Sequence, residues 1–487
     1  MNIIMVSSEC APVSKVGGLA DVVDGLGREL QNRGHTVEII LPKYDCMELG
    51  EILGLEVELE DLWVPYFSQW IRCTIHKGVV HELSCLFIEP HGEQKFFSRG
   101  VYYGQQDDPE RFAFFSIAVL EFISKSNRQP DIIHCHDWQT GLIPVLLSDI
   151  YANKGMSNTR VCYTLHNIKH QGTAKAKVLD LVGLNPKEYL RKDRLLDDSK
   201  PDFINLMKGG IVYSDSTNTV SPQYAWEIKN TDQGYGLERI LSEKDDKYQG
   251  ILNGIDYDTW NPEKDTFIHT NYGVNTIADK ELNKQALREK LMLSQDNKPL
   301  IAAVGRLDPQ KGVHLIKHTL FYALEHDCQF VLLGSSPDKE ISEYFWHLKY
   351  YLNDNPNCHL EIEYDDELAH MIYAGADMMV VPSFFEPCGL TQLISMKYGT
   401  IPVVRKTGGL KDTVFDANSK EGKKQNGFLF DEFTYAAMEE ALVRATGLWY
   451  KDPAAYKTLM INAMQCDYSW NHPSESYIKL YRSVIES

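Results

Sequence analysis

The sequence predicts an α/β protein made of two domains in series. Short apolar runs rich in Val and Ile alternate with helical stretches through the first half of the chain. A turn-rich segment with Gly250, Asn253, Gly254 and Pro262 interrupts this alternation, which restarts after it. The length of 487 residues is enough for two or three domains. We therefore place a domain boundary and hinge near residues 250–262.

Several segments are predicted as strands because each is apolar over consecutive residues. Runs of this kind are typical of strands that are buried on both faces, as in a parallel sheet covered by helices. In the first half, the strand candidates are residues 3–7, 36–42, 83–89, 131–136, 159–165 and 217–220. In the second half, they are residues 299–305, 328–333, 377–382 and 401–404.

Helices are predicted between these strands and at the end of the chain. Residues 21–32 follow the first strand, and residues 109–125 begin with Pro-Glu, a favoured helix start. The last helix is predicted over residues 473–487, where apolar positions recur at helical spacing: Tyr477, Leu480, Tyr481 and Val484. We expect this helix to dock on the rest of the protein.

Composition and charge exclude several classes of protein. The net charge is 49 − 68 = −19, which disfavours a broad surface for nucleic acid or an anionic membrane. No apolar run approaches the roughly 20 residues of a membrane span, and no secretory signal is recognisable. The ten cysteines are scattered without paired CxxC motifs. We expect a cytoplasmic protein with reduced thiols and no metal cluster.

A glycine-rich loop follows the first predicted strand. It runs from Lys15 through Gly17 and Gly18 to Asp21 and opens the first predicted helix. Glycines allow close approach of the backbone to a ligand, and the N–H groups of a helix start suit a diphosphate. The loop is neither G-x-G-x-x-G nor a P-loop. From the residues alone, a phosphate-binding loop and a simple turn both remain open.

Polar side chains also follow two later strands of the first half. Asp137 comes directly after His134 and His136, and His166 and Asn167 end the next strand. Ligands of open α/β sheets bind beyond the carboxyl ends of strands, so Asp137 is a candidate contact to substrate. The two histidines share a strand face, but the sequence offers no further ligands for a metal site. His166 is either a ligand contact or a core histidine.

The second half repeats this arrangement with cations. Arg306 and Lys311 lie between two glycines just beyond a strand, where they could clamp a diphosphate or belong to a solvated loop. The most distinctive stretch holds Glu386 between Phe385 and Pro387, before the helix start Gly389-Leu390-Thr391. Carboxylates bind hydroxyl groups well, and helix starts bind phosphate. The pattern favours a diphosphate-binding sugar site.

Together these motifs resemble the bacterial glycogen synthase and plant starch synthase family. Each motif is weak alone, but their order and spacing from Ser7 to Tyr481 make the set specific. The matching segments are Lys15-Val16-Gly17-Gly18-Leu19, His136-Asp137-Trp138, His166-Asn167, Thr219-Val220-Ser221-Pro222, Leu252-Asn253-Gly254-Ile255-Asp256, Arg306 with Lys311, Glu386-Pro387-Cys388-Gly389-Leu390-Thr391 and Thr407-Gly408-Gly409-Leu410.

The resemblance implies the GT-B fold, in which two Rossmann-like domains face a central cleft. Residues 1–253 would be the catalytic and acceptor domain, joined by the C-terminal helix 472–487, and residues 254–471 would bind the nucleotide sugar. The implied reaction is retaining transfer of glucose from ADP-glucose to the non-reducing end of an α-1,4-glucan, such as glycogen or a malto-oligosaccharide. The family implies no metal, no other cofactor, no nucleic acid and no membrane.

The resemblance also implies residue roles. Residues implied to act in catalysis are Lys15, Asp137, His166, Arg306, Lys311 and Glu386. In the first domain, implied contacts to donor phosphate or glucose also include Gly17, Gly18, Asp21, Tyr103, Asn167 and Asn253. In the second, Tyr364 would stack on adenine, and the phosphate would meet Cys388, Gly389, Leu390 and Thr391.

Two departures from the family pattern stand beside these matches. Many retaining GT-B enzymes carry a second Glu eight residues after the first, where this chain has Ile394. The loop Ile168–Gly172 is more polar than the resemblance leads us to expect, and it bears on acceptor preference. Alternatives are a GT-B transferase with another donor or acceptor, and a glucan-binding paralogue with little activity. A dinucleotide oxidoreductase is disfavoured because G-x-G-x-x-G is missing.

Overall fold

The computed structural model describes residues 1–419 and 424–486. The chain divides into two compact units, each built around its own sheet. The first unit comprises Met1–Gly254 and Trp470–Ser487, and the second comprises Ile255–Ser469. Ser487, the last residue of the predicted C-terminal helix, lies outside the described residues. The functions assigned to the two predicted domains stay predictions.

The first unit contains a nine-stranded sheet in the order β11-β10-β7-β6-β1-β2-β5-β4-β3. Its parallel strands are β1 (Asn2–Val6), β2 (Thr36–Pro42), β5 (Leu83–His91), β6 (Ile132–His136), β7 (Arg160–Leu165), β10 (Ser216–Thr219) and β11 (Tyr248–Gly250). The strand order reverses between β1 and β6, as in Rossmann folds. The loops that follow these two strands are therefore the expected place for a ligand.

A long antiparallel hairpin extends this sheet and was not predicted. It consists of β3 (Leu53–Tyr66) and β4 (Gln69–Val80), with β3 as the edge strand. The first half of β3 is mostly exposed, and in it Leu55, Val57 and Leu59 alternate with glutamates instead of forming an apolar run. That alternation has the period of a strand and could have predicted it. A separate ribbon pairs β8 (Thr173–Lys175) with β9 (Phe203–Asn205).

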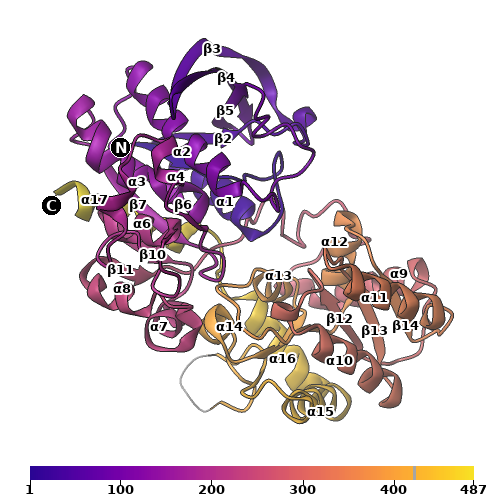
Figure 1. The fold of residues 1–487 in the computed structure, drawn as a ribbon. Coiled ribbons are helices and arrows are strands. Elements are labelled where there is room, and N and C mark those ends of the chain that lie inside the picture. The colour runs from indigo at the N-terminus through magenta and orange to yellow at the C-terminus, as the bar shows by residue number, and fades with distance from the viewer. Residues whose placement is uncertain (420–423, 487) are drawn as a thin grey trace. The chain divides into compact units, whose positions relative to one another are not determined.

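Helices cover the sheet of the first unit. They are α1 (Gly18–Asn32), α2 (Asp108–Lys125), α3 (Leu142–Leu146), α4 (Val178–Leu181), α5 (Pro186–Tyr189), α6 (Leu206–Tyr213), α7 (Pro222–Asn230), α8 (Glu238–Glu243) and α17 (Asn471–Glu486). Short 3-10 or π turns are Leu49–Glu51, Trp138–Thr140, Leu147–Tyr151, Ala152–Lys154, Asp232–Gly234 and Asp245–Lys247. The C-terminal helix α17 lies against α1 and β7, as its yellow ribbon shows among the indigo and magenta elements (Figure 1).

The second unit contains a six-stranded parallel sheet in the order β14-β13-β12-β15-β16-β17. The strands are β12 (Leu300–Val304), β13 (Gln329–Leu333), β14 (Cys358–Glu361), β15 (Met378–Val381), β16 (Ile401–Arg405) and β17 (Phe428–Phe430). Counted along the chain, this order is 3-2-1-4-5-6, the order of dinucleotide-binding sheets. The strand order reverses between β12 and β15, and these two strands precede Arg306 and Glu386 along the chain.

Helices also cover the second sheet, and one apolar core fills the space between them. They are α9 (Lys280–Lys290), α10 (Val313–Glu325), α11 (Lys339–Leu352), α12 (Asp366–Gly375), α13 (Thr391–Lys397), α14 (Gly408–Thr413), α15 (Tyr435–Lys451) and α16 (Pro453–Met464). The 3-10 turns are Val274–Asp279 and Pro309–Lys311. Strand residues such as Ile301, Val331 and Met379 are fully buried.

The predicted strands all occur in the structure, within one or two residues of their predicted ends. The α/β class is therefore confirmed. The predicted helices are confirmed as α1, α2 and α17, of which α1 begins earlier, at Gly18. Helix α2 is buried nearly all round from Arg111 to Ile123, although its sequence indicated a single apolar face. Strand β14 mixes polar and apolar residues (Cys-His-Leu-Glu), and β17 has only three residues, so neither forms a recognisable apolar run.

Candidate active site

The loop after β1 is organised by a buried carboxylate, Glu9. Its Oε2 accepts hydrogen bonds from the backbone N–H groups of Val16, at 2.6 Å, and Gly17, at 3.0 Å. Its Oε1 accepts from the Tyr103 hydroxyl at 2.6 Å. Burial raises the pKa of Glu9, and these three donors oppose that rise. Glu9 therefore connects the glycine-rich loop to the predicted glucose contact Tyr103, whose hydroxyl points at Glu9.

Glycine at position 17 is not required by the fold. Gly17 has extended backbone angles, φ −155° and ψ −168°, which any residue adopts. A Cβ atom added there would meet no protein atom within 4 Å. Lys15 in the same loop lies 2.8 Å from the Asp21 carboxylate, and both side chains are about one-third exposed. The loop is thus a half-exposed surface with a cation, and a small residue stands where a ligand could approach the backbone.

Asp137 lies where β6 ends, at the reversal of the strand order. Its backbone has φ +55°, an uncommon conformation for a residue other than glycine. Its Oδ1 accepts the backbone N–H of His166 at 2.7 Å and that of Asn167 at 3.4 Å. Burial raises the pKa of Asp137 to about 7. The carboxylate therefore fixes the end of β7, and the negative charge of nearby Glu9 adds to the rise in its pKa.

His166 is a buried residue with one hydrogen-bond partner for its ring among the described residues. Its Nε2 lies 3.0 Å from Nδ1 of His136. Burial lowers the pKa of His166 to about 3, so the ring is neutral near pH 7. Asn253 is also buried, and its Oδ1 has no partner among the described residues. A buried amide oxygen without a partner is costly, so it fits a contact to ligand.

In the second unit, Lys311 and Glu386 form an ion pair. The Lys311 ammonium lies 2.6 Å from Glu386 Oε2, and the hydroxyl of Ser383 donates to the same oxygen at 2.7 Å. The Glu386 side chain is 6% exposed, whereas Lys311 is 26% exposed. Arg306 is more open, at 47%, and its guanidinium lies 3.7 Å from Asp308. Of the two cations predicted to bind diphosphate, Lys311 thus contacts the predicted sugar-binding carboxylate.

The turn from Glu386 to Thr391 is held by a second glycine loop. The Gly409 N–H donates to the Glu386 carbonyl oxygen at 3.0 Å. A Cβ on Gly409 would lie 2.1 Å from the Cys388 carbonyl oxygen, so only glycine fits there. Gly389 has φ +77°, and residues 389–391 are half-exposed between buried neighbours. Helix α13 begins at Thr391 without a side-chain cap, which leaves N–H groups for another partner.

The remaining predicted contacts of the second unit differ in burial. Tyr364 is 74% exposed, and its hydroxyl donates to Asp366 at 3.0 Å. Ile394, at the position of the missing second Glu, is buried in the apolar core of the unit. A carboxylate at this position would be buried among apolar side chains in this structure.

Comparisons with known proteins agree with this arrangement. Residues 2–243 match the model of the starch synthase catalytic domain, and residues 283–460 match that of glycosyl transferases group 1. Glycogen synthase 1 of Nitrosococcus oceani is 56% identical, and the alignment covers 100% of both chains. Glycogen synthase 1 of Trichormus variabilis is 53% identical over 99% of both.

The chain belongs to the bacterial glycogen synthase family.

The enzyme is therefore a glycosyltransferase of the glycogen and starch synthase type. Its structure is similar to that of the catalytic domain of starch synthase IV from Arabidopsis thaliana, bound to ADP and acarbose. The TM-score is 0.97 with 44% identity, over 100% of this chain and 99% of that one. A sucrose-phosphate synthase from Thermosynechococcus elongatus, at 19% identity and a TM-score of 0.63, shares the fold. The two-domain GT-B fold is confirmed.

The described residues of the enzyme contain no group of three or more His, Cys, Asp and Glu side chains that could hold a metal ion. His134 and His136, the pair that raised the question of a metal, bond to protein groups instead. Catalysis without a metal or cofactor stays a prediction. Among the described helices, none is long and apolar enough to cross a membrane.

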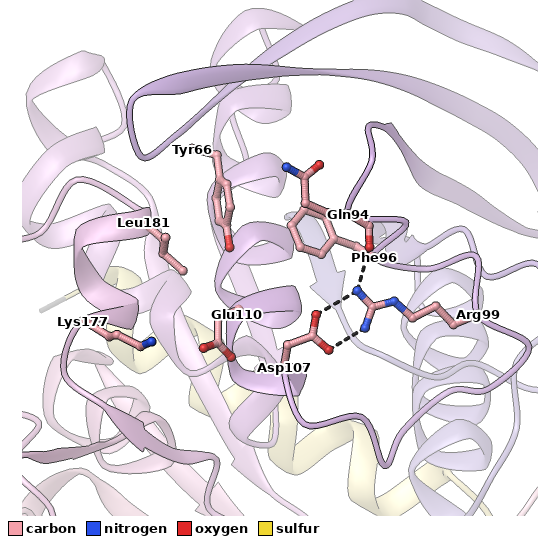
Figure 2. A pocket seen from close by; sticks show the side chains of 8 residues that line it. All are labelled: Tyr66, Gln94, Phe96, Arg99, Asp107, Glu110, Lys177 and Leu181. Atoms are coloured by element: carbon pink, nitrogen blue, oxygen red, sulfur yellow. Dashed lines mark hydrogen bonds and ion pairs between the residues drawn. The ribbon is translucent and has the colours of Figure 1, made fainter.

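A cavity of about 370 Å³ in the first unit contains none of the predicted site residues. It is lined by Tyr66, Gln94, Phe96, Arg99, Asp107, Glu110, Lys177 and Leu181. Figure 2 shows the Arg99 guanidinium held between the Asp107 carboxylate, at 2.8 Å, and the Gln94 carbonyl oxygen, at 2.7 Å. The contact between Arg99 and Asp107 thereby joins the two ends of the segment that carries Tyr103.

Sequence reasoning missed three residues that organise the site: Glu9, Ser383 and His136. Glu9 follows β1 in the polar run Ser7-Ser8-Glu9, so the rule that selected Asp137 could have selected it as well. Ser383 likewise follows β15. His136 was considered as a metal ligand or a core histidine and as part of a family motif, but nothing in the sequence shows that its ring meets His166, 30 residues later.

Proposed function

We propose that the enzyme transfers glucose from ADP-glucose to the non-reducing end of an α-1,4-glucan, with retention of the α configuration, and releases ADP. The glycogen synthase relatives and the starch synthase bound to ADP and acarbose support a nucleotide-sugar donor and a glucan acceptor. The observation that carries the proposal is the grouping of Lys311, Glu386 and the half-exposed turn 389–391 beside one strand reversal.

The second unit is proposed to hold the nucleotide. Arg306 and Lys311 neutralise the diphosphate, and the backbone N–H groups from Gly389 to Thr391, next to Cys388, donate to it. The exposed ring of Tyr364 stacks on adenine. The core position of Ile394 leaves the ribose without a second carboxylate, in keeping with a site that relies on cations and N–H groups.

Each unit carries residues that we propose to contact a substrate. Glu386 accepts hydrogen bonds from sugar hydroxyls through the oxygen that the Lys311 ammonium does not contact. In the first unit, the proposed contacts are Lys15, Gly17, Gly18, Asp21, Tyr103, Asp137, His166, Asn167 and Asn253. Glu9 positions two of these, because it holds both the Gly17 N–H and the Tyr103 hydroxyl.

The proposed chemistry is substitution on one face of the sugar. The bond from the anomeric carbon to the phosphate oxygen breaks, and the acceptor 4-hydroxyl oxygen forms the new bond from the same side. The departing phosphate oxygen takes the hydroxyl proton, and Arg306 and Lys311 stabilise its charge. A double displacement needs an available carboxylate nucleophile. Glu9 and Asp137 are poor candidates, because each already accepts backbone N–H groups.

Proton NMR of a reaction with maltotriose tests this chemistry. We expect ADP and a new α-1,4-linked glucosyl residue to appear in equal amounts from ADP-glucose. A β-linked product, or glucose formed without chain extension, would overturn the proposed reaction.

A further inference from the structure

A column of buried polar side chains connects the C-terminal helix to His166 within the first unit. The Tyr481 hydroxyl of α17 lies 2.8 Å from Nδ1 of His134. The rings of His134 and His136 are 4.1 Å apart between centroids, at an interplanar angle of 38°. His136 Nδ1 lies 3.0 Å from His166 Nε2. The column has discrete donors and acceptors, so the proton on each ring can be assigned from its partners.

The proton of His134 is fixed by three neighbours. The Asn218 amide nitrogen donates to the Tyr477 hydroxyl at 3.0 Å, which leaves the Asn218 amide oxygen as an acceptor. The Thr164 hydroxyl donates to that oxygen at 2.9 Å. Thr164 must then accept from His134 Nε2, 2.7 Å away. His134 is therefore protonated on Nε2, and its Nδ1 accepts the Tyr481 hydroxyl.

A single proton lies between His136 and His166. The other ring nitrogen of His136, Nε2, is enclosed and has no partner among the described residues. An enclosed lone pair without a partner is less costly than an enclosed N–H. The proton of His136 therefore lies on Nδ1, which donates to Nε2 of His166. Both rings are neutral, since burial lowers both pKa values.

The proton of His166 must then lie on Nδ1. This nitrogen has no hydrogen-bond partner among the described residues, and it is absent from the enclosed polar atoms that lack one. The remaining accessible surface of His166, 9% of the residue, is consistent with an N–H that meets substrate.

We infer that His136 is a positioning residue that fixes His166 as an Nδ1–H donor toward the transferred sugar. The inference rests on the proposed function, because it takes His166 as a sugar contact. The same assignment excludes His166 as the base for the acceptor hydroxyl. An Nδ1–H group binds a hydroxyl oxygen of the substrate but has no lone pair to accept the acceptor proton. The proton must therefore leave by another route, such as the departing phosphate.

Two substitutions of similar size separate this role from simple packing. In His136→Asn, the amide N–H occupies nearly the position of the Nδ1–H and keeps the donor to His166. His136→Leu fills the space but donates nothing. We expect His136→Leu to lower kcat for transfer from ADP-glucose by about 10- to 100-fold, and His136→Asn to stay within a few-fold of the parent enzyme. The KM for ADP-glucose should change less than kcat.

The tautomer is read directly by NMR of protein with ¹⁵N-labelled histidine rings, with His166 assigned by the signals lost in His166→Asn. We expect the proton on Nδ1 in the parent enzyme and in His136→Asn, and a shift of population to Nε2 in His136→Leu. Tyr481→Phe is the control, because it removes a hydrogen bond of the column without touching the pair His136–His166. A parent His166 protonated on Nε2 would overturn the inference, even if His136→Leu did not fold.

The two measurements distinguish a failure of the proposed function from a failure of the inference. If the parent enzyme transfers no glucose from any nucleotide sugar, the proposed function is wrong, and the NMR spectrum still reports the tautomer. If transfer is normal and His136→Leu changes neither kcat nor the tautomer, the inference is wrong and the proposed function stands.

Discussion

Lys311 and Glu386 share a short contact that joins two loops of the second unit. The ammonium lies 2.6 Å from a carboxylate that is almost fully buried, so each side chain sets the position of the other. Pairing of this kind holds the proposed cation for the leaving diphosphate and the proposed carboxylate for the sugar in one arrangement. Their 75-residue separation in the chain explains why the sequence nominated both residues without showing that they touch.

Removing the charge of Glu386 should affect turnover far more than folding. Glu386→Gln keeps an acceptor for the Ser383 hydroxyl but loses the partner charge of Lys311. We expect kcat/KM for ADP-glucose to fall by about 10²- to 10³-fold. Lys290→Met is the matched control, since it breaks an exposed pair with Glu367 in the same unit. Equal activity in Glu386→Gln and Lys290→Met would refute the role of the carboxylate.

Single residues were predictable where they follow a strand at a reversal of strand order. Asp137, Arg306 and Glu386 all do so, and local pattern was enough to select them. Contacts between distant segments were not predictable in this way. The Glu9–Tyr103 bond and the His136–His166 bond depend on how strands pair, and no local sequence pattern encodes that pairing.

Among the glycines of helix α1 and its N-cap, two have opposite surroundings. Gly17, at its N-cap, faces no protein atom within 4 Å. Gly25, in its middle, packs so closely on Trp470 that an added Cβ would lie 2.0 Å from the indole nitrogen. The fold does not require a glycine at position 17. Gly25, in contrast, is required for the docking of the segment that leads into α17.

Substitutions of these two glycines should affect activity and stability separately. Gly25→Ala should destabilise the first unit by about 1–3 kcal/mol through overpacking, which lowers Tm by a few degrees. Gly17→Ala should leave Tm almost unchanged and weaken transfer, because the methyl group would obstruct the substrate that we propose this loop contacts. Differential scanning fluorimetry and initial rates measure both effects. A lower Tm in Gly17→Ala would contradict the argument.

Strands and helices were well predicted where their apolar pattern reflects burial. The parallel strands are enclosed on both faces, and α17 buries the residues that its spacing selected. The hairpin β3–β4 was missed because its exposed edge strand mixes leucines with glutamates. The buried hydrogen bonds of α17 were missed for a different reason. The hydroxyls of Tyr477 and Tyr481 lie within the apolar stripe of the helix, where they bond to buried polar groups.

The two units repeat one principle of construction. In each, the sheet reverses its strand order at a central pair of strands, and the predicted ligand groups follow those strands. The −19 net charge of the chain contrasts with the cations that these loops carry. An acidic enzyme that binds an anionic donor must concentrate its positive charge in the site.

Buried neutral histidines make the stability of the first unit depend on pH. Burial lowers the pKa values of His134 and His166 to about 3, below the value near 6.5 of an unfolded chain. Their contribution is complete above about pH 6.5 and is lost as the pH falls toward 3. Asp137, with its pKa raised to about 7, contributes in the opposite direction. Glu9, whose pKa is also raised by burial, contributes in the same direction as Asp137. The buried histidines, which include His136 with its lowered pKa, outnumber these two carboxyl groups, so stability falls with acid.

Thermal unfolding from pH 7 to pH 5 measures this dependence. Each histidine removes up to about 1.4 kcal/mol per pH unit below pH 6.5. His166→Asn should show a shallower loss of Tm than the parent enzyme over that range. A Tm that is constant or rises from pH 7 to pH 5 would contradict the buried, neutral column.

Transfer of labelled glucose into polymer tests the central claim most directly. The parent enzyme and Glu386→Gln are incubated with glycogen and either ADP-glucose or UDP-glucose, each labelled in the sugar, and the label in precipitated polymer is counted. We predict rapid incorporation from ADP-glucose by the parent enzyme, little from UDP-glucose, and little from either donor by Glu386→Gln. No incorporation from either donor by the parent enzyme would contradict the account.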